Sequence, residues 1–89
     1  MRIDMFFKIA CIFKSRAIAA NLIKKELIKV NNKSIKAAYE VKPGDMIEIN
    51  DTDKRTELRI LAIPQKKSVS KKEAKDYYDV ISSKKIDSF

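Results

Sequence analysis

The spacing of apolar residues predicts two helices at the start of the chain. The first is expected over residues 3–13 and should be mostly buried. Its apolar positions recur at helical intervals and are Ile3, Phe6, Phe7, Ala10 and Phe13. Cys11 lies within this stretch and is expected to be a small core residue. Ser15 is a natural N-cap for a second helix over residues 16–26, because its hydroxyl can accept a hydrogen bond from a free backbone N–H.

Alternating apolar and polar positions then predict a small antiparallel sheet. Ile28 begins a hairpin whose turn is Asn31-Asn32-Lys33, since Asn tolerates the left-handed backbone of a tight turn. Lys42-Pro43-Gly44-Asp45 has the composition of a second turn, with Gly at the position of positive φ. The strands are expected over residues 28–31, 46–49 and 56–63, with a polar turn over 50–54 and Pro64 ending the last strand.

The last quarter of the chain is predicted to be helical. Ser70 and Glu73 have the spacing of a capping box, and apolar residues follow at intervals of three and four. A third helix is therefore expected over residues 71–83, after a basic linker at 65–69 and before a frayed tail through Phe89. The predicted fold is α+β: two N-terminal helices packed on a small antiparallel sheet, plus a C-terminal helix. The expected division is a domain over 1–64, with the linker and C-terminal helix over 65–89.

The positive charge of the chain is concentrated in its first half. The net charge is +8. Residues 1–44 contain ten Lys or Arg and three Asp or Glu, which leaves +7, whereas residues 45–89 contain ten and nine, which leaves +1. An excess of cations in one half favours a nucleic acid or an anionic membrane surface as the partner.

Composition excludes most catalytic and membrane-spanning proteins. The chain has no His, one Cys and one Gly, so it lacks the commonest general base and cannot form a zinc site or a glycine-rich phosphate loop. We expect no enzyme activity, no metal and no cofactor. No apolar stretch approaches the roughly 20 residues that cross a bilayer, and the N-terminus lacks the layout of a signal peptide. The protein is therefore expected to be cytoplasmic and monomeric.

The residues that could hold a phosphate backbone lie mainly in the first half. Arg16 stands beside the free N–H groups that begin the second helix, which favours phosphate binding. Arg2 could instead pair with Asp4, and lysines on a helix face are often simply solvated. The complete candidate set for RNA binding is Arg2, Lys8, Lys14, Ser15, Arg16, Lys24, Lys25, Lys29, Asn31, Lys33 and Lys36.

A second basic run and the tyrosines are weaker candidates. Lys71 and Lys72 precede acidic residues, and Lys72–Asp76 and Lys75–Asp79 have the spacing of weak ion pairs on a helix surface. Tyr77 and Tyr78 would lie about 100° apart on that helix. The more exposed of the two could stack on an unpaired base.

The order of these pieces resembles the S-four RNA-binding domain. The resemblance covers residues 1–49, and two positions depart from it: Glu26 and Asn32 stand where the family usually has Gly. Asn32 keeps the turn possible, whereas Glu26 implies that the second helix either lacks a left-handed glycine cap or runs slightly longer. The matching pieces are Arg2-Ile3-Asp4, Ser15-Arg16, Ala19-Ala20, Ile23, Ile28-x-Val30-Asn31 and Pro43-Gly44-Asp45-Met46-Ile47.

The second half resembles a narrower group. The strand Arg59-Ile60-Leu61-Ala62-Ile63 and the segment from Lys72 to Tyr78 are similar to the heat-shock-protein-15-like group, which includes the bacterial ribosome quality-control factor P. That resemblance implies a protein that docks on a free large ribosomal subunit carrying an obstructed peptidyl-tRNA. Its implied partners are large-subunit rRNA, peptidyl-tRNA and a tail-elongation factor of quality control.

Two other functions remain open from the sequence. S-four domains often precede RNA-modifying domains, so the chain could be an RNA-binding accessory subunit of an rRNA- or tRNA-modifying enzyme. A protein of an anionic membrane surface is the other alternative. It would need an exposed amphipathic helix, whereas the apolar faces of both N-terminal helices are required for the core.

Overall fold

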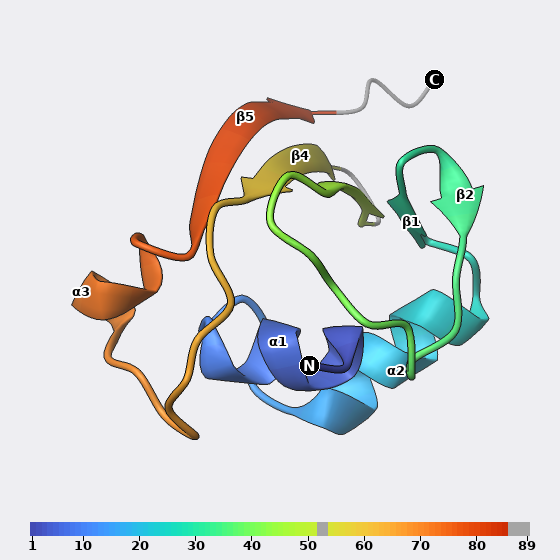
Figure 1. Cartoon of the computed structure of the whole chain (residues 1–89). Helices are drawn as coiled ribbons and strands as arrows, with labels where there is room; N and C mark the ends of the chain where they lie inside the picture. The colour runs from blue at the N-terminus through green and yellow to red at the C-terminus, as the bar shows by residue number, and fades with distance from the viewer. Residues whose placement is uncertain (52–53, 86–89) are drawn as a thin grey trace.

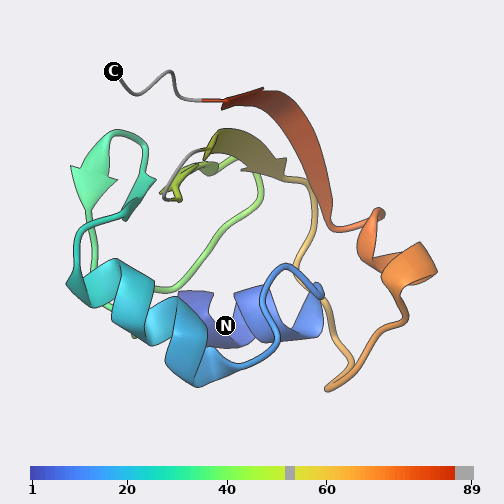
Figure 2. The ribbon, with the colours of Figure 1, turned by 180° about the vertical axis from the view of Figure 1, so that it is seen from behind.

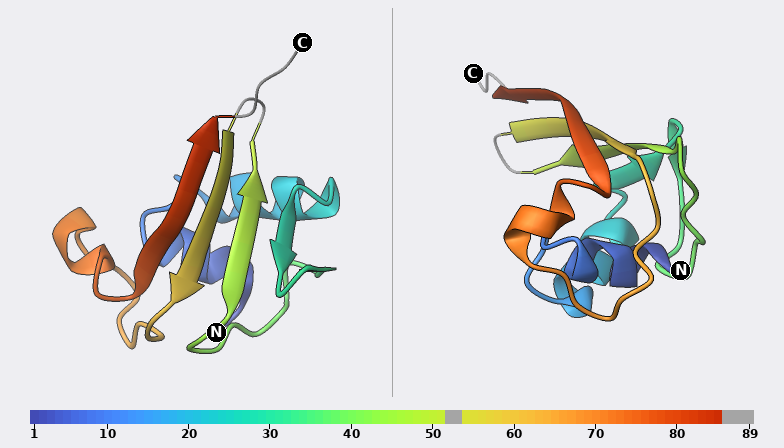
Figure 3. Two further views of the ribbon diagram at one scale, coloured as in Figure 1. Left: turned by 90° about the horizontal axis from the view of Figure 1, so that it is seen from above. Right: turned by 60° about the vertical axis from the view of Figure 1, so that its left-hand side comes forward.

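The computed structural model describes residues 1–51 and 54–85, and it has two layers (Figures 1 and 2). Helices α1 and α2 form one layer, and a five-stranded sheet forms the other. The short helix α3 lies beside the start of the last strand (Figure 3). In chain order the elements are α1 (Ile3–Ile9), α2 (Arg16–Lys24), β1 (Ile28–Val30), β2 (Lys33–Ser34), β3 (Met46–Asn50), β4 (Lys54–Ile60), α3 (Lys71–Ala74) and β5 (Tyr78–Lys85).

The sheet is antiparallel throughout, in the order β2-β1-β3-β4-β5. One face packs on the helices through residues such as Ile28, Ile47 and Leu58, all almost fully buried. The other face is left uncovered by helices (Figure 3, left). Strand alternation places apolar side chains on the inner face and polar ones on the outer face, as a sheet covered on one side requires.

Helix α1 is shorter than the sequence indicates. It ends at Ile9 rather than at residue 13, and Cys11 adopts a left-handed backbone with φ of 60°. The N–H groups of Cys11 and Ile12 donate to the carbonyls of Lys8 and Phe7, which is the Schellman pattern of a helix end. Cys11 is exposed rather than buried, so its predicted place in the core is wrong. Phe6 and Phe7 are fully buried, as expected.

Helix α2 starts as predicted and ends two residues early. The Ser15 hydroxyl accepts the N–H of Ile18 at 3.2 Å. After Lys24 the chain turns left-handed at Glu26, with φ of 60°. The N–H groups of Glu26 and Leu27 donate to the carbonyls of Ile23 and Leu22, so this helix also ends in the Schellman pattern. The cap conformation is therefore kept although a Glu, not a Gly, occupies it.

Both predicted turns around the first strands are present. Asn31 and Asn32 have φ of 51° and 68°, which is the type I′ geometry that joins β1 to β2. In the second turn Gly44 has φ of 95°, and the N–H of Asp45 donates to the carbonyl of Lys42 at 3.1 Å. The predicted strand over 46–49 is β3. The polar turn over 50–54 includes residues 52 and 53, which lie outside the described residues.

The C-terminal segment differs most from the expectation. Ser70 caps α3 by accepting the N–H of Glu73 at 3.2 Å, but the helix ends at Ala74 instead of residue 83. The chain from Tyr78 onward is β5, which pairs with β4. Asp76 and Asp79 therefore follow the end of α3, and the ion pairs predicted for them on a helix surface are absent from this helix. The preceding strand, β4, also ends earlier than expected, at Ile60. The predicted tail over 86–89 lies outside the described residues.

Candidate nucleic-acid interface

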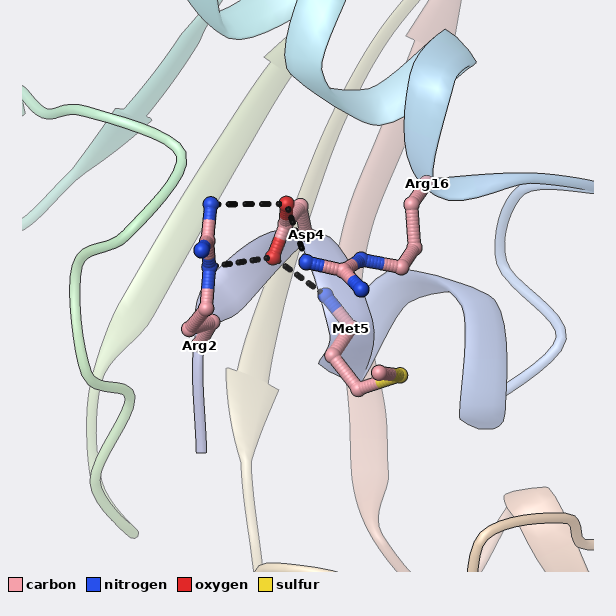
Figure 4. A network of polar contacts seen from close by, with 4 residues as sticks. All are labelled: Arg2, Asp4, Met5 and Arg16. Atoms are coloured by element: carbon pink, nitrogen blue, oxygen red, sulfur yellow. Dashed lines mark hydrogen bonds and ion pairs between the residues drawn. The ribbon is translucent and has the colours of Figure 1, made fainter.

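Two arginines at the starts of α1 and α2 meet at one buried carboxylate (Figure 4): Arg2 is the N-cap residue before α1, and Arg16 is the first residue of α2. Asp4 lies in the first turn of α1, and its side chain is only 5% exposed. Its Oδ1 accepts the N–H of Met5 at 2.8 Å and the Nε–H of Arg2 at 3.2 Å. Its Oδ2 accepts from Nη2 of Arg2 and from Nη2 of Arg16, each at 3.3 Å. The pairing of Arg2 with Asp4 that the sequence allowed is therefore formed, and Arg16 joins it.

This cluster, Arg2-Asp4-Arg16, keeps its cations accessible. The side chains of Arg2 and Arg16 are 51% and 40% exposed, whereas the carboxylate between them is buried. Two cations and one anion leave a net positive charge at the surface. Because each guanidinium has five N–H donors in a rigid fork, contacts to Asp4 leave donors free for a phosphate. The cluster can thus present two oriented cations to one anionic backbone.

The start of α2 adds donors at the same place. A helix leaves its first N–H groups without intrahelical partners, and the Ser15 hydroxyl takes only that of Ile18. The backbone N–H groups of Arg16 and Ala17 point out of the helix start, where the helix dipole also favours an anion. Ser15 therefore acts first as the N-cap, and through it the position of Arg16 is set.

The structure divides the remaining predicted cations into separate groups. Lys8 is exposed in the last turn of α1, and Lys14 is exposed in the connection to α2. Lys24 and Lys36 border one groove between α2 and the segment that follows β2. Two further predicted residues, Lys25 and Lys33, are exposed at the end of α2 and on β2.

Lys29 is separated from the arginine cluster by the sheet itself. Its neighbours Ile28 and Val30 are buried toward the helices, so Lys29 points to the uncovered face and lies opposite Glu48 of β3. Glu48 also accepts from Arg55 and, at 2.9 Å, from the amide of Asn50. The Asn50 hydrogen bond, followed by the charges of Arg55 and Lys29, lowers the pKa of Glu48 even though burial opposes this shift. Lys29 thus belongs to an ion cluster on the other face.

Asn31 is exposed, but its side-chain amide is held by hydrogen bonds within the fold. Its Nδ2 donates to Oδ1 of Asp45 at 3.2 Å, and its Oδ1 accepts the N–H of Met46 at 3.1 Å. Asp45 also accepts from the Tyr39 hydroxyl at 2.9 Å and from the N–H of Lys42 at 3.0 Å. Burial, with the hydrogen bond to Asp45, raises the pKa of Tyr39. The sequence did not predict this hydrogen-bond network around Asp45. Only the place of Asp45 after the Pro-Gly turn could be recognised as part of a motif.

The described residues contain no group of three or more His, Cys, Asp or Glu side chains that could hold a metal ion. Within the same residues, no helix is long and apolar enough to cross a membrane.

Comparison with known proteins identifies an S4 domain in the first half of the chain. The S4 domain model matches residues 1–47. The RQC P-site tRNA stabilizing factor of Streptococcus pneumoniae is 31% identical over 87 residues, covering 98% of this chain and 97% of that protein. The protein of the same name from Helicobacter pylori strain 26695 is 34% identical over 77 residues, covering 86% and 92%.

Two solved structures have the same fold. Vibrio cholerae Heat Shock Protein 15, described as trimeric, superposes with a TM-score of 0.82 at 22% identity, covering 92% of this chain and 82% of that one. A hypothetical protein, HP1423, superposes with a TM-score of 0.79 at 32% identity, covering 92% and 98%. Both resemblances inferred from the sequence are confirmed by these matches.

Proposed function

We propose a function for this protein from its family: it belongs to the S4 domain family and, within it, to the RQC P-site tRNA stabilizing factors. It binds RNA on the free large ribosomal subunit and catalyses no reaction. There it contacts rRNA and the obstructed peptidyl-tRNA during quality control in the cytoplasm, as a monomer that can work beside a tail-elongation factor. The relatives' name supports the tRNA partner, and they match nearly the whole chain.

The observation that carries this proposal is the Arg2-Asp4-Arg16 cluster. Two half-exposed guanidinium groups, from the starts of α1 and α2, share one buried carboxylate, so they reach the surface already oriented. A phosphate backbone needs several cations on one face, and each neutralised phosphate releases counterions. Folded RNA offers phosphates on a fixed shape, which a preorganised pair of cations can match. The mechanism is electrostatic docking that reads RNA shape more than sequence.

Binding to purified large subunits, with and without peptidyl-tRNA, tests the proposal across a range of salt concentrations. We expect affinity to be higher when peptidyl-tRNA is present and to fall steeply with added salt. The variant Arg16→Gln should weaken binding about tenfold, equivalent to ~1.4 kcal/mol, and should lower the salt slope by about one. It should fold, because Arg2 still pairs with Asp4.

The matched control is Arg59→Gln, which makes the same substitution at an exposed arginine of β4 that is outside the predicted RNA-binding set. It should change affinity less than about twofold, as expected of a peripheral charge. The proposal would be overturned if the wild-type protein does not bind large subunits, or if its affinity for them does not change with salt concentration. A collapsed far-UV spectrum for Arg16→Gln would show that Arg16 is needed for folding instead.

A further inference from the structure

A groove of about 980 Å³ runs along α2 beside the segment that follows β2. One wall is the flank of α2 that carries Ala20 and Ile23. The opposite wall is the chain from residue 34 to 39, where Ile35, Ala38 and Tyr39 contribute apolar surface. An open, largely apolar groove of this size is unusual for the surface of a small monomeric protein and marks a binding site.

The rim of the groove is charged. Lys24 of α2 and Lys36 of the opposite wall both border it, together with one carboxylate, Glu26. Both lysines are exposed, so their ammonium groups can reach an anion lying along the opening. The rim therefore carries a net positive charge around an apolar floor.

One wall of the groove is attached to the helix start that carries the arginine cluster. The carbonyl of Tyr39 accepts the N–H of Ile3 at 2.7 Å, and the carbonyl of Ala37 accepts the N–H of Asp4 at 3.4 Å. On the other wall, Arg16 precedes Ala20 and Lys24 by four and eight residues, so it shares their face of α2, about 12 Å along the helix from Lys24. Arg16 and Lys24 therefore present cations along the face of α2 that also carries the apolar wall.

Tyr39 gives the groove a fixed aromatic element. Its hydroxyl donates to Oδ2 of Asp45 at 2.9 Å, and Asp45 is itself held by Asn31 and by the backbone of Lys42. The ring cannot swing away without breaking the Asp45 contact. Bases stack on aromatic side chains with little dependence on sequence.

We propose that this groove receives one unpaired nucleotide of the RNA whose backbone lies on Arg2 and Arg16. Its base packs on the apolar wall and Tyr39, and its phosphate lies between Lys24 and Lys36. The inference rests on the proposed function and specifies it further: the bound RNA has an unstacked base at this point. A paired base cannot enter, since its faces are covered within the helix.

RNA is favoured over a peptide as the occupant by the charges. Lys24 and Lys36 border the groove, and Arg16 lies on the same face of α2 as Lys24. A nucleotide combines a flat apolar base with an adjacent phosphate, which matches an apolar floor with cations at the rim.

The test compares two RNA duplexes of one sequence, one with a single bulged 2-aminopurine and one fully paired. We expect the bulged RNA to bind more tightly and its 2-aminopurine fluorescence to be quenched. Ala20→Leu, which fills the groove with an aliphatic side chain, and Lys24→Ala should each weaken binding of the bulged RNA about tenfold. Neither should change binding of the paired duplex by more than about twofold.

Each variant has a control outside the groove and outside the predicted RNA-binding set. Asn21→Leu places a leucine at an exposed position of α2 that does not line the groove, and Lys67→Ala removes an exposed cation from the linker before α3. Both should bind the bulged RNA like the wild type. Melting curves check that Ala20→Leu folds. If it does not, Lys24→Ala decides, because Lys24 is exposed at the end of α2.

The inference is overturned if Ala20→Leu and Lys24→Ala bind the bulged RNA like the wild type. It is equally overturned if they lose the same affinity for the bulged and the paired duplex. It is also overturned if Ala20→Leu and Lys24→Ala weaken binding only of a fluorescein-labelled acidic, apolar peptide. That result would show that the groove binds a protein segment instead of RNA. In these cases the proposed function stands if Arg16→Gln still weakens binding to large subunits. Wild-type protein that does not bind large subunits would instead remove the proposed function itself.

Discussion

Nη2 of Arg16 lies 3.3 Å from Oδ2 of Asp4, twelve residues earlier in the chain. This ion pair joins the start of α2 to the start of α1. The Asp4 side chain is nearly buried, while that of Arg16 is 40% exposed. The carboxylate therefore serves as a fixed anchor, and the guanidinium remains available to a ligand at the surface.

Replacing that anchor should weaken RNA binding although it makes the protein more positive. In Asp4→Asn the side chain keeps its shape but loses the charge that orients Arg2 and Arg16. We expect affinity for large subunits to fall about tenfold, or ~1.4 kcal/mol, as measured by equilibrium binding. Simple charge counting predicts the opposite change, since the net charge rises by one.

Asp76→Asn is the control for this charge change. Asp76 is exposed after α3 and carries no ion pair within the described part of the chain, so the same substitution adds the same charge without freeing an arginine. Binding should be unchanged or slightly tighter. If Asp4→Asn and Asp76→Asn both tighten binding equally, orientation by Asp4 has no role.

The two asparagines of the hairpin turn should respond differently to glycine. Both have positive φ, which Gly adopts without strain, but only Asn31 holds Asp45 and Met46 by its amide. Asn31→Gly should lower the free energy of unfolding by about 1–2 kcal/mol, because buried groups of Asp45 lose a partner. Asn32→Gly should stay within about 0.5 kcal/mol of the wild type. Urea denaturation of both variants compares them, and equal losses would contradict a role for the amide of Asn31.

Glycine at position 26 should stabilise the protein. Glu26 has φ of 60° at the end of α2, where an L-residue pays a steric cost. Glu26→Gly should raise the free energy of unfolding by about 1 kcal/mol. Lys25→Gly, one residue earlier with φ of −80°, should lower it by about 0.5 kcal/mol, because Gly has more freedom in the unfolded chain. The two variants are compared by denaturant titration, and a loss of stability in Glu26→Gly would contradict the strain.

Glu48 should contribute to stability above the ordinary carboxyl range and not below it. Its folded pKa is lowered from 4.5 by the Asn50 hydrogen bond and then by Arg55 and Lys29, against the effect of burial. A lowered folded pKa gives stability that is present above the unfolded pKa and is lost as pH falls through the folded one. Urea midpoints measured from about pH 6 to 3 should therefore fall less steeply in Glu48→Gln than in the wild type.

The control for this titration is Glu57→Gln. Glu57 contacts the same Arg55 at 3.3 Å but is more exposed, at 36% against 19% for Glu48. Its replacement should lower the urea midpoint at neutral pH less than Glu48→Gln does, because solvent screens an exposed ion pair. If the urea midpoints of the wild type and Glu48→Gln fall equally steeply from about pH 6 to 3, the prediction is contradicted.

Local chemistry was enough to locate the turns and helix starts from the sequence. Ser15 and Ser70 cap helices as expected, since a hydroxyl at that position meets a free N–H within three residues. Asn31-Asn32 and Gly44 take positive φ for similarly local reasons. The family resemblance followed from these pieces because their order and spacing were visible in the chain.

Helix lengths and the last strand depended on contacts that local patterns do not contain. Cys11 and Glu26 are unfavourable residues for a left-handed cap, yet the chain turns there so that the helices pack on the sheet. Ala74, Tyr77, Tyr78 and Ile81 fit a helical period, but Tyr and Ile are also good strand formers. The open edge of β4 pairs with the chain from Tyr78 onward as β5, a choice that sequence spacing alone could not resolve.

Residue order and spacing were thus enough to predict the family, the starts of the helices, the turns and the concentration of cations in the first half. How those cations are grouped depends on the folded chain. It brings Arg16 to Asp4 across twelve residues, aligns Lys24 with Lys36 along one groove, and sends Lys29 to the opposite face of the sheet. The reason is physical: capping and turn formation act over a few residues, whereas burial of the helices against the sheet sets which distant charges meet.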